Sequence, residues 1–153
     1  MRGYFVPFVA GVVLIISAFL PWVVINGVSR SGVPEAPGLW VVGLGALAAV
    51  LAALSLITRR NSRHPLLVTG LFALGVTVLS WRIMPRLANE QAWTMSQALA
   101  IVDNEPAVNV PMALVGSGLY VGVAASIALV AFGLTIVVRR AKPYAIASPD
   151  DDV

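Results

Sequence analysis

The sequence predicts an all-α fold, a four-helix transmembrane bundle, and its composition and apolar runs carry that prediction. Hydrophobic residues make up 59% of the 153-residue chain and charged residues only 11%, whereas about a quarter of an ordinary soluble domain is charged. The mean hydropathy is +0.90. Four apolar runs are each near the ~20 residues with which a helix crosses a ~30 Å hydrocarbon core: 5–25, 38–58, 66–84 and 113–138. Because lipid offers backbone amides no partner and the runs do not alternate as barrel strands do, each is expected to be helical.

The first run, 5–25, is expected to be a retained membrane helix. It begins near Pro7, a residue tolerated in the first turn of a helix, and it reaches a Phe-Leu-Pro-Trp sequence that ends at Trp22. Only Arg2 precedes the run, and Phe-Leu-Pro-Trp is not a small-residue cleavage site, so a removed signal peptide is not expected. Trp22 is expected to be an interfacial anchor with its indole N–H in water.

The outer loop between the first two runs, 26–37, reads NGVSRSGVPEAP and is rich in turn-forming residues. We expect a loop that is too short to form a domain. Trp40 then begins the second helix, at the same depth as Trp22.

Small residues recur at intervals of four in the second and fourth runs. They are Gly45, Ala49 and Ala53 in one run and Gly118, Gly122 and Ser126 in the other. Small side chains let helix backbones approach closely, since packing drives helix association within lipid. The stripes predict that the second helix packs on the fourth. An oligomer interface is the alternative, and small residues are also simply common in membrane helices.

The segments 38–60 and 118–140 resemble each other. Both begin with Gly-Leu followed by an aromatic residue, continue through apolar residues and end on a double arginine at the same spacing. Apolar composition alone does not produce the aromatic start and the arginine end. The likeness predicts a tandem duplication of a two-helix hairpin, with the two repeats related by an axis along the membrane normal.

The outer segment 85–112 is the longest stretch outside the predicted membrane spans. Its first half reads as an amphipathic helix, with Leu87, Met95, Leu99 and Val102 on one face. This helix either extends the third span or lies on the membrane surface, and Pro85 predicts a kink or break at the boundary. The second half reads as an extended loop.

Basic residues are concentrated at one end of the predicted bundle. Seven flank the side with both termini, against Arg30, Arg82 and Arg86 on the other; besides Arg2, the seven are Arg59, Arg60, Arg63, Arg139, Arg140 and Lys142. The positive-inside rule then places both termini in the cytoplasm, and these last six are expected to bind anionic lipid headgroups. The membrane domain is 1–142 and the cytoplasmic polar tail is 143–153. The arginine-rich composition is typical of a GC-rich bacterial genome, so the bacterial inner membrane is expected and nucleic acid is not a predicted partner.

The chain lacks the residues of most membrane chemistry. It has no cysteine and one histidine, His64, so a thiolate metal site and a haem held by two histidines within one chain are not expected. No zinc-ligand cluster, phosphate-binding loop or nucleophile elbow is present. The predicted spans hold no ionisable residue away from their ends, since Arg82 lies near a helix end and can reach outward. We therefore expect no catalytic residue, metal or cofactor, and no enzymatic activity.

Aromatic residues gather at or beyond the predicted outer boundary. An aromatic belt at the membrane interface explains them, and a docking surface is the alternative, favoured by Trp93 in the outer segment. The residues expected at a partner contact are Trp93, Met95, Leu99, Trp40 and Trp81.

The Phe-Leu-Pro-Trp sequence followed by Asn26-Gly27 in a four-span frame resembles small actinobacterial membrane proteins of unknown function. By analogy of class, the small size and the missing catalytic groups look like an accessory subunit of a respiratory complex. We expect a non-catalytic accessory or assembly subunit that packs on a larger membrane complex, with other membrane subunits and lipids as partners. The alternative is a binder or carrier of an apolar small molecule, such as a quinone or lipid, between the first and third helices and lined by Phe8, Phe19 and Phe72.

Overall fold

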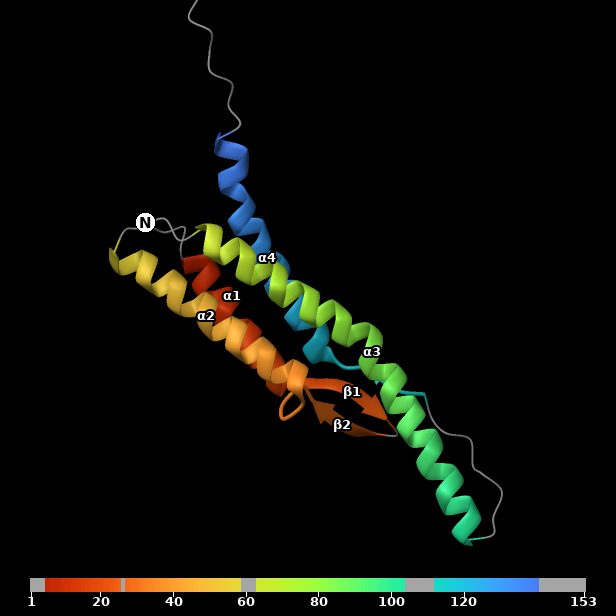
Figure 1. Ribbon diagram of the computed structural model, residues 1–153. Helices are drawn as coiled ribbons and strands as arrows, with labels where there is room; N and C mark the ends of the chain where they lie inside the picture. Colours follow the sequence, from red (N-terminus) through yellow and green to blue (C-terminus); the bar gives the residue numbers. More distant parts are fainter. Residues whose placement is uncertain (1–4, 26, 59–62, 104–111, 141–153) are drawn as a thin grey trace, which may run out of the picture.

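The computed structural model describes residues 5–25, 27–58, 63–103 and 112–140. Within this part of the chain, the helices are α1 (Phe5–Phe19), α2 (Ala36–Thr58), α3 (Arg63–Asp103) and α4 (Ser117–Arg140), and the strands are β1 (Pro21–Ile25), β2 (Val28–Ser31) and β3 (Leu114–Val115). The helices run up and down in a bundle, and the strands lie at one end of it (Figure 1). The tail 143–153 lies outside the described residues.

Three of the helices contain segments long and apolar enough to cross a membrane: Ala36–Thr58, His64–Val102 and Ser117–Thr135. The helix α1 has only 15 residues, about 22 Å of helix. The predicted first span, 5–25, is therefore wrong in its outer part, because the helix ends at Phe19 and the chain continues as β1. Pro21 has no backbone N–H with which to continue the helical ladder.

Each helix packs on two neighbours: α1 lies against α2 and α4, and α3 lies against α4 and α2. The predicted packing of the second helix on the fourth is wrong, because α2 and α4 are diagonal in an up-and-down bundle. The small residues instead bring each of these helices against α1 or α3. A Cβ on Gly45 would lie 2.9 Å from the carbonyl oxygen of Gly11, and one on Gly122 would lie 3.1 Å from Oγ of Ser17.

The two hairpins α1–α2 and α3–α4 use the same helix register. A Cβ on Gly11 would lie 2.8 Å from the backbone nitrogen of Ala49, and a Cβ on Gly70 would lie 3.0 Å from Cβ of Leu129. Ala49 and Leu129 occupy equivalent positions when 38–60 is aligned with 118–140. In both hairpins a glycine of the first helix therefore contacts the same place on the second helix.

The segment expected as the loop 26–37 contains the second strand of a β-hairpin. The strands β1 and β2 pair antiparallel with Ile25 opposite Val28, and Gly27 takes a positive φ of 79° in the turn. Asn-Gly between short runs of β-branched residues is a strong hairpin signal. The strand β3 pairs with the other edge of β1, so the sheet order is β2-β1-β3.

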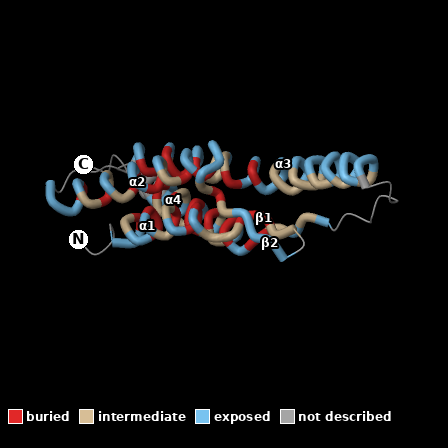
Figure 2. Tube along the Cα trace, turned by 90° about the horizontal axis from the view of Figure 1, so that it is seen from below, coloured by how far each residue is buried: buried red, intermediate tan, exposed pale blue. Residues whose placement is uncertain are grey.

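The helix α3 is continuous over 41 residues and has Pro85 in its interior. The predicted break at Pro85 is wrong. The outer segment extends the third span as one helix and is not a separate helix on the membrane surface. The 18 residues that follow Pro85 carry the helix about 27 Å past the proline, beyond the bundle (Figure 1). Proline removes one hydrogen bond of the ladder, and the rest of the long helix outweighs that loss. Buried residues follow the bundle, whereas the projecting half of α3 is exposed or intermediate (Figure 2).

Candidate functional site

Trp22 lies in a closed socket at the junction of the bundle and the sheet. Its side chain is fully buried, and its indole Nε1 donates a hydrogen bond to the carbonyl oxygen of Ser17 at 2.8 Å. The predicted interfacial anchor with a wet indole N–H is therefore wrong. A Cβ on Gly32 would lie 2.5 Å from the indole ring, and one on Gly118 would lie 2.6 Å from it. Two glycines from distant parts of the chain thus leave the space that the ring fills.

Around this socket, backbone hydrogen bonds join the segments that follow β3 and β2 to β1 and to the end of α1. The amide of Gly116 donates to the carbonyl of Trp22 at 2.8 Å, and the amide of Val33 donates to the carbonyl of Ala18 at 3.0 Å. The β1–β2 register shifts between Pro21 and Val23. Irregular pairing of this kind re-aims a side chain, and here Trp22 points into the bundle end. These hydrogen bonds and the buried ring of Trp22 therefore hold the base of the hairpin against the bundle.

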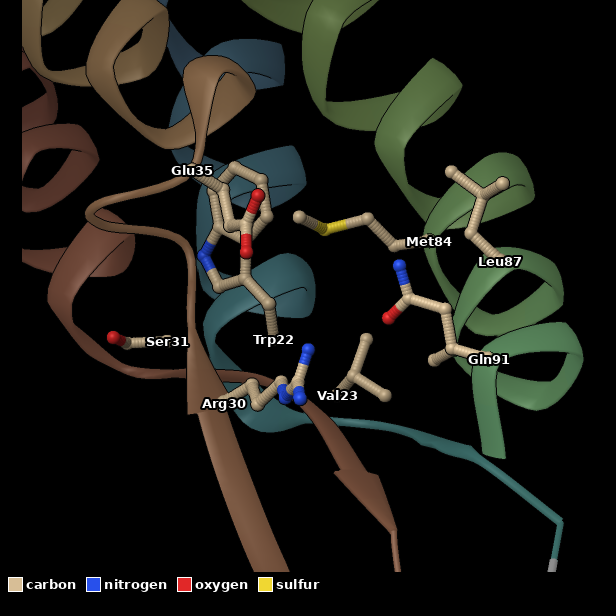
Figure 3. Close-up of a pocket in the computed structure, with 9 residues that line it drawn as sticks. Trp22, Val23, Arg30, Ser31, Glu35, Met84, Leu87 and Gln91 are labelled. Carbon is tan, nitrogen blue, oxygen red and sulfur yellow. The ribbon is translucent and has the colours of Figure 1, made fainter. Parts of the chain in front are cut away.

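A groove runs between the hairpin and the projecting part of α3. Its inner part is a cavity of about 100 Å³ at the base, lined by Trp22, Val23, Arg30, Ser31, Glu35, Met84, Leu87, Ala88 and Gln91. Met84 and Gln91 extend from α3 toward the hairpin side of this cavity (Figure 3). The outer part is larger, about 500 Å³, and is lined by Ile25, Val28, Arg30, Ala88, Gln91, Ala92 and Met95. Arg30, Ala88 and Gln91 belong to both parts, which makes the groove continuous.

The groove holds few polar groups. Arg30 and Glu35 are both exposed and both line the inner part, yet neither forms an ion pair with any described residue. Among the described residues that line the outer part, Arg30 is the one charged residue and Gln91 is the one amide. The other residues that line the outer part are aliphatic or methionine. This pattern, an apolar surface with a single cation, is typical of a site that orients an apolar ligand by one charged end.

The residues predicted at a partner contact are all exposed, but they do not form one patch. Trp40 stands on α2 with 66% of its surface exposed, and Trp81 packs edge to face on Tyr120 of α4 with ring centroids 5.0 Å apart. Trp93 and Met95 are two residues apart on α3, so they lie on opposite sides of that helix. Met95 lines the groove, and Leu99 continues along the same side. Trp93 faces away from the groove.

Three of the predicted lipid-headgroup residues lie in helices that the structure describes, at the end of the bundle opposite the sheet. Arg63 begins α3, and Arg139 and Arg140 end α4 at the same end (Figure 1). Their side chains, and the whole of Arg59, Arg60 and Lys142, lie outside the described part of the structure.

The described residues include no group of three or more histidine, cysteine, aspartate or glutamate side chains that could hold a metal ion. Comparison with protein-family models, with curated protein sequences and with solved structures finds no match to this chain. The resemblance to actinobacterial membrane proteins therefore stays an expectation, and the function must be inferred from the geometry.

The groove residues Arg30 and Gln91 were not among the predicted site residues. The wall that carries Arg30 exists only because 21–31 folds as a hairpin, and the signal for it was the Asn-Gly pair between Val-Val-Ile and Val-Ser-Arg. Gln91 faces that wall because α3 continues through Pro85.

Proposed function

We propose that the chain is a non-catalytic integral membrane subunit that docks on a larger membrane complex through the projecting part of α3. One observation carries the proposal. The helix extends about 27 Å past Pro85, and its far side and end expose Trp93, Ile101 and Val102 at 51%, 82% and 78%. A helix that holds bulky apolar side chains in water, far from its own bundle, is typical of a contact surface for another protein.

We also propose a placement in the membrane, which the same geometry supports. The bilayer surrounds the bundle, and α1 crosses it between α2 and α4 despite its shorter length. The aromatic side chains Trp40, Trp81 and Tyr120 stand near the sheet end of the bundle, where an interfacial belt is expected. The sheet and the projecting half of α3 lie outside the membrane, and the arginine-rich end lies in the cytoplasm.

A duplicated hairpin also belongs to this proposal. The matching sequences 38–60 and 118–140 and the shared glycine register at Gly11 and Gly70 both support it. The two halves have diverged at the sheet end, since Trp22 is fully buried and Trp81 is 36% exposed.

The test is extraction from native membranes in mild detergent, followed by native electrophoresis and mass spectrometry of the band. We expect co-migration with a larger complex. Trp93→Ser and Ile101→Ser should release the chain from that complex, whereas Val50→Ser, at a lipid-facing site with 54% exposure, should not. A particle of the size of the chain alone, or of a small homo-oligomer, would contradict the subunit proposal.

A second candidate, the binding of an apolar small molecule, is favoured by the groove between the hairpin and α3. The version expected between the first and third helices has no support from two of the three phenylalanines named for it. Phe19 and Phe72 are 61% and 65% exposed and so do not line the bundle interior, and α1 and α3 are diagonal. The groove provides an apolar site at another place, outside the bundle.

A further inference from the structure

The hairpin and α3 present two apolar surfaces to each other across the groove. Val23 pairs with Arg30 and Ile25 pairs with Val28, so these four residues share the sheet face that lines the groove. The opposing side of α3 carries Ala92 and Met95. The surfaces meet at the base, where Trp22 and Met84 line the narrow inner part, and they are separated further out.

Both apolar surfaces remain in water as the groove stands. Val28 is 67% exposed and Met95 is 68% exposed. Covering such surface is favourable by about 25 cal/mol for each Å² removed from water. The outer part, of about 500 Å³, is within the range of about 300–1,000 Å³ that is typical of sites for one small ligand. This size favours a ligand with one acyl chain over a larger one with two.

The charge of Arg30 determines which head group the ligand can carry. Arg30 forms no ion pair with any described residue, and the amide of Gln91 lines the same part of the groove. A guanidinium binds carboxylate and phosphate through parallel hydrogen bonds, and an amide N–H adds a further donor. Glu35 lines only the inner part, and none of the described residues that line the outer part is a carboxylate.

We propose that this groove binds a single-chain anionic amphiphile, with the anionic head at Arg30 and Gln91 and the chain along Ile25, Val28, Ala92 and Met95. The shared chemistry is one acyl chain and one carboxylate or phosphate head. This ligand class rests on the second function proposed above and makes it specific. Because the groove lies on the part of the protein that projects from the bundle, it would shield the acyl chain of the ligand from water there.

The experiment is photolabelling of the full-length protein in detergent micelles with a palmitic acid that carries a diazirine on its chain. After illumination, the labelled peptides are mapped by mass spectrometry. We expect labels in the hairpin near Val28 and in α3 near Met95. Arg30→Ala should lower this labelling about tenfold or more, as expected for the loss of a charged hydrogen-bond donor, and Arg30→Lys should retain part of it. The control is Arg86→Ala, because Arg86 is exposed nearby on α3 but does not line the groove.

A second variant tests the apolar part without changing charge. Ala92→Phe fills the groove from the α3 side, and we expect it to abolish labelling while Gly43→Ala, on the lipid-facing side of α2, leaves it unchanged. Retained folding is checked by the blue-shifted fluorescence of Trp22 in a variant with the other three tryptophans replaced by phenylalanine. Folded Ala92→Phe protein that still labels at Val28 would overturn the proposal.

Further probes decide the head group and separate the two proposals. Labelling by a probe with one acyl chain and a phosphate head, instead of or as well as the carboxylate probe, supports the proposal and identifies the head group that the site prefers. Equal labelling by the neutral diazirine palmityl alcohol would overturn the anionic class and leave the apolar binder standing. Labelling by a two-chain phosphatidylglycerol probe alone would overturn the single-chain class. If no probe labels the groove, both the ligand class and the apolar binder fail, and a polypeptide partner becomes the occupant to seek.

Discussion

The indole Nε1 of Trp22 donates to the carbonyl oxygen of Ser17 at 2.8 Å, across the end of α1. The last carbonyls of a helix lack partners within the helix, and this one also accepts from the amide of Leu20 at 3.3 Å. A buried side chain from β1 thus completes the end of the helix that precedes it. The bond links the hairpin, and with it one wall of the groove, to the bundle.

Trp22→Phe should therefore destabilise the protein. The variant removes the donor to Ser17 and leaves a gap beside Gly118, with an expected loss of about 1–3 kcal/mol in the free energy of unfolding. The measurement is equilibrium unfolding in mild-detergent micelles. Trp40→Phe is the control, because Trp40 is 66% exposed, and it should leave the free energy nearly unchanged. Equal stability of the two variants would contradict the buried hydrogen bond.

Gly118→Ala should also destabilise the fold. The added methyl would lie 2.6 Å from the ring of Trp22 and 2.8 Å from the carbonyl oxygen of Ser17, and backbone cannot move as freely as a flexible side chain. Overpacking of this kind costs about 1–3 kcal/mol. The matched control is Gly43→Ala, where the methyl meets no heavy atom within 4 Å and helix propensity favours alanine. Unfolding midpoints compared by circular dichroism would test the pair, and a Gly118→Ala protein as stable as Gly43→Ala would argue against the socket.

Much of the bundle could be predicted from the sequence, because long apolar runs indicate membrane-length helices without reference to distant residues. The predicted run 113–138, for example, corresponds to α4, which begins at Ser117. The burial of Trp22 could not be predicted in this way. It depends on Gly32 and Gly118, which the sequence places 10 and 96 residues away and only the fold brings to the two sides of the ring.

The groove could not be predicted from the sequence, because two local signals indicated a helix break and a loop where its two walls lie. Pro85 is a helix breaker in isolation, but it lies inside a helix whose remaining ladder outweighs one lost bond. The segment 26–37 is rich in turn residues, which obscured the short strand Val28–Ser31. A two-stranded hairpin is marginal alone, and this one is fixed by β3 and by the socket of Trp22, so its stability comes from partners that no local window contains.

Ser55→Ala should leave stability unchanged or raise it by up to about 1 kcal/mol. The hydroxyl of Ser55 is buried and has no hydrogen-bond partner, so its removal relieves an unsatisfied polar group. Ser126 provides the comparison, because its hydroxyl is equally buried but donates to the carbonyl of Gly122 at 2.8 Å. Ser126→Ala should lower the free energy of unfolding by about 0.5–1.5 kcal/mol. A loss of stability in Ser55→Ala together with a gain in Ser126→Ala, measured as free energies of unfolding in the same detergent, would contradict this difference.

The absence of cysteine makes single-cysteine labelling a clean test of orientation. In intact bacterial cells that express the chain, a membrane-impermeant maleimide should label Ser29→Cys, which lies on the exposed hairpin. It should label Thr58→Cys, at the exposed end of α2 near the arginine-rich loop, only after the cells are permeabilised. The opposite pattern would reverse the proposed placement of the termini.

Asn89 should hold the chain that enters β3 against α3. Its side-chain oxygen accepts a hydrogen bond from the amide of Ala113 at 2.7 Å, the residue just before the two-residue strand Leu114–Val115. A strand this short has few ladder bonds of its own, so the amide of Ala113 should exchange with solvent faster when the acceptor is removed. We expect Asn89→Ala to raise that exchange rate about fivefold, in keeping with the ~1 kcal/mol net value of such a bond.

Hydrogen–deuterium exchange measured by mass spectrometry of the peptide that contains Ala113 would provide the rate. Asn89→Asp should preserve protection, because a carboxylate oxygen accepts the same bond and charge strengthens it. Gln97→Ala, an exposed position on the same helix, should have no effect. If Asn89→Ala exchanges at the rate of the unchanged protein, the amide is protected by something other than Asn89, and the edge of β1 does not depend on α3 for its order.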